Sequence, residues 1–245
     1  MQRTTRGRSL NASSLRYTHF EKLPLRRPVD RIGFISNACQ GLNVLDIGCY
    51  DETALVKRET EFWLHSRICA VANRVIGVDS STQIPDAGVS TATNGRIFKS
   101  NASTLSSIDL GDFDPDVIVA GEFIEHISDP ISFISSVKQR FPSKMLVLST
   151  PNACSVSNGL MGAFGWESQH PDHLHNFTFK TLHTSCARSG LESWEIVPYR
   201  FFATEMILRS RFPMKQAARI AEGLIRAAER LAPALSFGYI VVARI

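Results

Sequence analysis

The sequence lacks any apolar run approaching the ~20 residues that a membrane-spanning helix needs. It also lacks a secretory signal, because Met1–Ser9 contains no apolar stretch. Charged residues make up only 20% of the chain and hydrophobic residues 44%, which excludes a disordered chain. We therefore expect a soluble, cytoplasmic protein.

The sequence also has no Cys-x-x-Cys pair, and its five cysteines are odd in number. Both features argue against a disulfide framework and against a thiolate zinc site, and they suit a reducing compartment. No zinc-finger spacing or basic-aromatic interleaving is present, so no nucleic-acid partner is expected.

The excess of basic over acidic residues, 27 to 23, lies largely in the first 31 residues. Residues 1–27 are expected to form a basic, flexible arm. The length of 245 residues suits one further domain over 28–245, with a helical insertion at about 203–234.

Short β-rich apolar runs alternate with stretches of helical periodicity, which predicts an α/β fold with a mostly parallel sheet between helices. The predicted strands are Asn43–Ile47, Arg74–Val78, Val117–Ala120, Met145–Thr150, Glu192–Val197 and Phe237–Arg244. The predicted helices are Pro28–Cys39, Thr53–Ala72, Pro130–Arg140 and Thr178–Ser189.

Carboxylates stand at the ends of the first two predicted strands. Asp46 is followed by Gly48, where the chain must turn tightly and a ligand can approach the backbone. Asp79 ends the next strand, and a carboxylate there accepts hydrogen bonds from the two hydroxyls of a ribose. The alternative is a pair of surface aspartates that cap turns.

With these residues the chain resembles the class I S-adenosylmethionine-dependent methyltransferases, from about Asp30 to Val197. The resemblance rests on Leu45–Cys49, on Asp79, on the Glu-x-x-Glu-His turn of Glu122, Glu125 and His126, and on Ser149–Asn152. It implies an enzyme on a doubly wound, Rossmann-like sheet of about seven strands whose final strand is antiparallel. It also implies S-adenosylmethionine as the cofactor.

By position, the resemblance places the cofactor against Asp46, Gly48, Cys49, Tyr50, Asp79, Ser80, Asn101, Ala102 and Glu122. Where the family often has glycine, this chain has Tyr50 and Glu52, so the turn must be rebuilt. The stretch Thr60–Ala72 resembles a subgroup with a similarly glycine-poor turn, often assigned to glycan assembly. Trp63 and His65 would then lie near the methionine end, or in the core.

A general base helps a hydroxyl acceptor, whereas a carboxylate acceptor needs none. The candidate catalytic residues are His126, His170 and His173, although the last two could simply form a turn before a helix capped by Thr178. Some related enzymes with the Glu-x-x-Glu-His turn bind magnesium, to which Glu122, Glu125 and His126 could contribute ligands together with Asp172 or His173. We assign no metal ligand.

Two further segments could serve the acceptor. Asn152–Gly165 is apolar and punctuated by glycine, which suits a mobile lid, an acceptor-binding wall or a plain surface helix. Phe212–Ala232 predicts an amphipathic helix with a basic stripe opposite its apolar side chains. We expect it to pack on the domain or on a partner in a homodimer with its charged face solvated, or else to contact an anionic membrane.

These features favour methyl transfer from S-adenosylmethionine to a small-molecule, saccharide or lipid-linked acceptor, at oxygen. A non-catalytic binding or interaction module on the same fold is the alternative, because Tyr50 and Glu52 could occlude the pocket. A nicotinamide-dependent oxidoreductase should show Gly-x-Gly-x-x-Gly, which is not present. The acceptor and the oligomeric state are not identified by the sequence.

Overall fold

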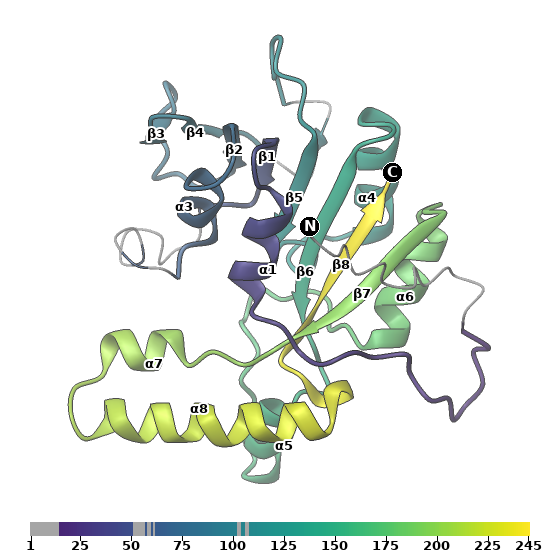
Figure 1. Ribbon diagram of the computed structural model, residues 1–245, viewed down its shortest axis with the longest axis vertical. Helices are drawn as coiled ribbons and strands as arrows, with labels where there is room; N and C mark the ends of the chain where they lie inside the picture. The colour runs from purple at the N-terminus through teal and green to yellow at the C-terminus, as the bar shows by residue number, and fades with distance from the viewer. Residues whose placement is uncertain (1–14, 51–56, 58–59, 61, 102–103, 106–107) are drawn as a thin grey trace, which may run out of the picture.

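The computed structural model describes residues 15–245 apart from 51–56, 58–59, 61, 102–103 and 106–107 (Figure 1). Its strands are β1 (Asn43–Ile47), β2 (Arg74–Asp79), β3 (Val89–Ala92), β4 (Gly95–Lys99), β5 (Val117–Gly121), β6 (Met145–Pro151), β7 (Ser193–Tyr199) and β8 (Gly238–Arg244). Its helices are α1 (Arg31–Ala38), α3 (Leu64–Cys69), α4 (Pro130–Arg140), α5 (Val156–Ala163), α6 (Phe179–Arg188), α7 (Thr204–Arg209), α8 (Met214–Leu231) and the short 3₁₀ helix η3 (Pro233–Leu235).

The described strands form one sheet in the order β3-β4-β2-β1-β5-β6-β8-β7. Neighbours pair in parallel from β4 to β6, while β8 runs antiparallel to both β6 and β7. The predicted doubly wound fold and antiparallel final strand are confirmed. The sheet has eight strands instead of about seven, because β3 pairs antiparallel with β4 at the edge.

Helices cover both faces of the sheet because alternate strand residues point in opposite directions (Figure 1). On one face Leu45 and Ile118 lie in a core cluster that includes Phe133 and Ile134 of α4. On the other, Val44 and Val117 lie in a cluster with residues of α1 and α3. The strands are therefore almost wholly buried, as a parallel sheet requires.

Local signals explain where the helices begin. Asp129 caps α4 by accepting the Ser132 N–H, and the Thr178 and Thr181 side chains form a capping box on α6. Asp30, and not Pro28, sets the start of α1, because its carboxylate accepts the Gly33 N–H. Helix α3 begins only at Leu64, whereas the prediction started at Thr53 and falls partly on residues outside the described part.

Helices α5, α7 and α8 gather at one end of the molecule, beyond the carboxyl ends of the parallel strands (Figure 1). Helices α7 and α8 occupy the region in which the sequence placed a helical insertion. Residues 1–14 of the predicted arm lie outside the described residues. Two residues in the rest of the arm contact the domain: Tyr17 forms a hydrogen bond with His183, and Arg26 forms a salt bridge with Glu195.

Candidate active site

A cavity of about 890 Å³ opens at the carboxyl ends of the central strands. All the predicted site residues that the structure describes line it: Asp46, Gly48, Cys49, Tyr50, Asp79, Ser80, Asn101, Glu122, His126, His170 and His173. Ala102, predicted at the adenine, and Glu52 lie outside the described residues. The volume falls within the range of ordinary ligand sites.

The turn after β1 depends on Gly48. Its φ of +67° lies in the left-handed region, which favours glycine. A Cβ atom here would stand 2.5 Å from Cδ2 of Phe123, a residue in the loop after β5. Gly48 is thus required both for the backbone turn and for close packing of the two loops.

Asp79 stands at the end of β2 with both carboxylate oxygens oriented by the backbone. Oδ2 accepts the Tyr50 N–H at 2.9 Å, and Oδ1 accepts the Ser81 N–H at 2.8 Å. Burial raises the pKa of this carboxyl above its ordinary value, although the backbone donors oppose the shift. A carboxylate has about four acceptor positions, so Asp79 can still accept two ribose hydroxyls. The site therefore fits a nucleoside.

Asp46 lines the cavity, but its carboxylate is engaged by a buried histidine. Asp46 Oδ2 lies 2.8 Å from Nδ1 of His65, whose Nε2 lies 2.8 Å from the Thr91 hydroxyl. His65 is buried, and interactions with Cys49 and Asp46 outweigh that burial and raise its pKa well above the ordinary value. Asp46 and His65 are thus a buried pair that supports the cavity floor.

Glu122 belongs to a network that the sequence patterns did not reveal. Tyr199 donates its hydroxyl to Glu122 Oε1 at 2.8 Å, and the Arg31 guanidinium lies 3.3 Å from Oε2. Val29 forms an isolated parallel bridge with Tyr199, the last residue of β7, and this places Arg31 near Glu122. Tyr199 lies two residues past the predicted strand Glu192–Val197, close to the place where side chains meet ligands in such sheets, so it could have been suspected. Arg31 carried no comparable signal.

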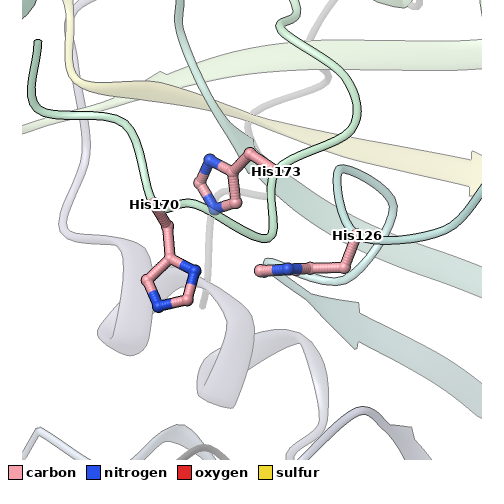
Figure 2. Close-up of side chains that lie close together, drawn as sticks. All are labelled: His126, His170 and His173. Carbon is pink, nitrogen blue, oxygen red and sulfur yellow. The ribbon is translucent and has the colours of Figure 1, made fainter.

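Three imidazoles converge at the cavity wall (Figure 2). One nitrogen each of His126, His170 and His173 lies within 4.8 Å of the other two. The backbone N–H groups of Leu174 and His175 donate to the Glu125 carbonyl, which holds the two loops together. Burial, with the nearby His126 and His170, lowers the pKa of His173, so this imidazole is readily neutral. Such a cluster can accept a proton or hold a transition-metal ion.

Glu125, beside His126, is buried in the same cavity wall. Its carboxyl oxygens have no hydrogen-bond partner of good geometry among the described residues. Burial, reinforced by the charge of Glu122, raises the pKa of Glu125 to about 8. At neutral pH this carboxyl is therefore protonated.

A family model described as a methyltransferase domain matches residues 17–196, which is most of the chain. The chain belongs to this methyltransferase family. No curated protein matches the methyltransferase by sequence. The predicted family, enzyme class and S-adenosylmethionine cofactor are confirmed at the level of the family.

Solved structures support the same fold. A SAM-dependent methyltransferase from Archaeoglobus fulgidus has a TM-score of 0.50 and 18% identity over 87% of this chain and 94% of that chain. An S-adenosylmethionine-dependent methyltransferase from Mesorhizobium loti has a TM-score of 0.50 and 16% identity over 88% and 96%. The small RNA methyltransferase HEN1 has a TM-score of 0.55 and 15% identity over 93% of this chain and 27% of that chain.

Proposed function

We propose that this methyltransferase transfers the methyl group of S-adenosylmethionine to an oxygen atom of a small-molecule, saccharide or lipid-linked acceptor. The observation that carries the proposal is that one cavity joins the Asp79 carboxylate to three imidazoles. The first suits a ribose, and the second suits removal of a proton from a hydroxyl. A saccharide is included among the possible acceptors because Thr60–Ala72 resembles the subgroup that is often assigned to glycan assembly.

The charges of the network favour the zwitterionic methionine end of the cofactor. The Arg31 guanidinium can bind the methionine carboxylate, and the Glu122 carboxylate can bind its ammonium group. Tyr199 and Ser149 hold these two side chains in place. When bound, S-adenosylmethionine supplies a methyl group on an electron-poor sulfur.

The acceptor hydroxyl is activated by an imidazole of the cluster. A neutral His126 or His173 would take the proton of the acceptor hydroxyl as that oxygen accepts the methyl group. His170 orients the acceptor or the neighbouring imidazoles. Holding the acceptor oxygen in line with the methyl group contributes much of the acceleration.

The test uses cell extracts and S-adenosylmethionine with an isotopically labelled methyl group. Labelled products are expected with the wild-type chain and with Asp86→Ala, which removes an exposed carboxylate outside the cavity. They are not expected with Asp79→Ala. Cofactor binding by calorimetry without a labelled product in any extract would favour a non-catalytic module instead. A labelled RNA would overturn the proposed acceptor class.

A further inference from the structure

Helix α8 turns charged side chains toward the domain. Glu229 accepts the Phe201 N–H at 3.0 Å, and Glu222 accepts the Ala203 N–H, also at 3.0 Å. Arg226 donates to the Phe201 carbonyl at 2.9 Å. The sequence led us to expect the apolar side of this helix against the domain, but its two carboxylates face the domain instead. Lys215, Arg219 and Arg230 of the basic stripe are exposed, as expected.

The consequence is a large exposed apolar surface. Ile220, Leu224 and Leu231 of α8 are 66%, 69% and 88% exposed. Helix α5 lies against α8, has no buried residue and is followed by Trp166, which is 70% exposed. We use the name apolar face for a set of ten exposed side chains on α5, α7, α8 and the adjoining loops: Leu160, Met161, Phe164, Trp166, Met206, Phe212, Met214, Ile220, Leu224 and Leu231.

The apolar face concentrates an unusual share of such side chains. It holds ten of the fifteen exposed large hydrophobic side chains among the described residues. Helices α5 and α7 both contact α8, so these side chains gather at one end of the molecule. Monomeric soluble proteins rarely leave such a concentration of apolar side chains uncovered, so the face indicates an interaction site.

Cations predominate beside the apolar face, although the exposed Glu167 directly follows Trp166. The exposed charged residues of segment 206–232 are all cationic: Arg209, Arg211, Lys215, Arg219 and Arg230. The acidic residues of the same segment, Glu222 and Glu229, are not exposed because they bond to the backbone of the domain. A partner must therefore offer apolar contact and negative charge together.

We propose that the apolar face docks on an anionic lipid bilayer. Acyl chains receive the apolar side chains, and anionic headgroups meet the lysine and arginines. Trp166 has the amphipathic ring that suits the boundary between headgroups and acyl chains. A two-fold contact between copies through this face would instead set the same cations against one another.

Docking also narrows the acceptor class, a step that rests on the proposed function. Asn158 and Ser155, at α5, line the cavity together with Ser168 of the loop that follows. The apolar face thus borders the cavity on the acceptor side. An acceptor with a polar head and a lipid anchor in the same membrane can reach the three imidazoles without leaving the bilayer.

Flotation of the full chain with vesicles, without cofactor, tests the docking. One vesicle is phosphatidylcholine alone, and the other is an equal mixture with phosphatidylglycerol. The wild-type chain floats with the mixed vesicles. Ile220→Glu with Leu224→Glu lowers its partition at least tenfold, and Lys215→Glu with Arg219→Glu lowers it and weakens its salt dependence. Phe20→Glu, at a 97% exposed apolar residue outside the face, leaves partition unchanged.

Absence of wild-type binding to the mixed vesicles, or unchanged binding of the Ile220→Glu and Leu224→Glu variant, overturns the proposal. So does a wild-type dimer by light scattering that this variant dissociates, because the face then belongs to a second copy. Circular dichroism checks that each variant is folded. Calorimetry with S-adenosylmethionine separates the two proposals: a chain that floats but binds no cofactor contradicts the proposed function and leaves the docking intact.

Discussion

Single side chains in the cavity are oriented before any ligand binds. Backbone donors fix both oxygens of Asp79, and Tyr199 with Arg31 fixes those of Glu122. The backbone of Glu122 has a positive φ of 55°, which residues other than glycine rarely adopt. Such preorientation lowers the entropy lost when a ligand binds and concentrates function in a few residues.

Asp79→Ala is expected to weaken S-adenosylmethionine binding tenfold or more. Each charge-assisted hydrogen bond to the ribose contributes roughly 1.5–3 kcal/mol, and the Tyr50 and Ser81 N–H groups also lose their acceptor. Calorimetry measures the affinity, with Asp86→Ala as the matched control. Unchanged affinity in a folded Asp79→Ala variant would contradict the assignment.

Tyr50→Gly is expected not to improve cofactor binding, although glycine is common at this position in the family. The Tyr50 ring packs edge-on against Trp63, with centroids 6.4 Å apart, and its N–H orients Asp79. A glycine would remove that contact and loosen the turn. Calorimetry with S-adenosylmethionine compares the affinities of the wild-type chain and the Tyr50→Gly variant. A clearly higher affinity of the variant would show that the turn with Tyr50 impairs cofactor binding.

His126→Ala and His173→Ala separate the role of the base from that of cofactor binding. The variant that lacks the base should lose on the order of 10²–10⁴ in the chemical step, with cofactor affinity nearly unchanged. The neutral imidazole is the active form, so the step should rise with pH. If His173 is the base, the rise should level off below the histidine reference of about 6.5, because burial lowers the His173 pKa.

Single-turnover methyl transfer across pH measures these effects once an acceptor is known. Losses of no more than about tenfold in both variants would contradict a histidine base, since a positioned base contributes more than that. A carboxylate acceptor, which needs no base, would then account better for the site.

At the scale of elements, the cavity exists because loops after neighbouring parallel strands meet at one edge of the sheet. The register pairs Asp46 of β1 with Gly77 of β2 and Val119 of β5. Gly77 has no room for a side chain, because a Cβ would stand 2.7 Å from Cys49 Sγ and 3.0 Å from His65 Cε1. The buried Asp46–His65 pair therefore depends on a small residue in the adjacent strand.

Gly48→Ala should destabilise the fold more than Gly41→Ala. Both glycines have a positive φ, of 67° and 70°, so both alanines bear the same backbone strain, of order 1 kcal/mol. Only at Gly48 does the new Cβ meet another residue, Phe123, which should add roughly 1–3 kcal/mol. Urea unfolding measures the free energy of unfolding of both variants. An equal loss in the two would show that the Phe123 side chain moves aside without cost.

For the whole molecule, the buried Glu125 links stability to pH. Its pKa is about 8 in the folded chain, against an ordinary value of 4.5, so the folded chain holds a proton that the unfolded chain releases. The stabilising contribution is complete below pH 4.5 and is lost as the pH rises toward 8.

The free energy of unfolding should therefore fall between pH 5 and pH 8, by on the order of 1 kcal/mol per pH unit from this group. Glu125→Gln removes the titrating group and should flatten the slope, whatever its effect on absolute stability. Urea unfolding at several pH values measures the slope, with Asp86→Asn as a control at an exposed carboxylate. An equal slope in wild type and Glu125→Gln would contradict the protonated state.

Features that depend on residues close in sequence followed from the sequence alone. The bounds of β1 and α4 matched their predictions, because apolar periodicity and the Asp129 cap act within a few residues. The position of Asp79 at a strand end also followed, since strand and turn are contiguous. Strands β3 and β4 were both absent from the predicted strands, because Val89–Ala92 and Gly95–Lys99 are short and have weak apolar periodicity.

Features that depend on packing between distant segments were decided by the tertiary structure. His126, His170 and His173 were candidates from the sequence. Their rings come together in the fold, where backbone hydrogen bonds join the two loops that carry them. The Arg31–Glu122–Tyr199 network joins three elements that share no motif. The amphipathic pattern of α8 was legible, yet which side faces the domain was not. The periodicity of a sequence determines how side chains divide around a helix. Which side of α8 faces the domain depends instead on the backbone N–H groups of Phe201 and Ala203, which need acceptors and find them in Glu229 and Glu222.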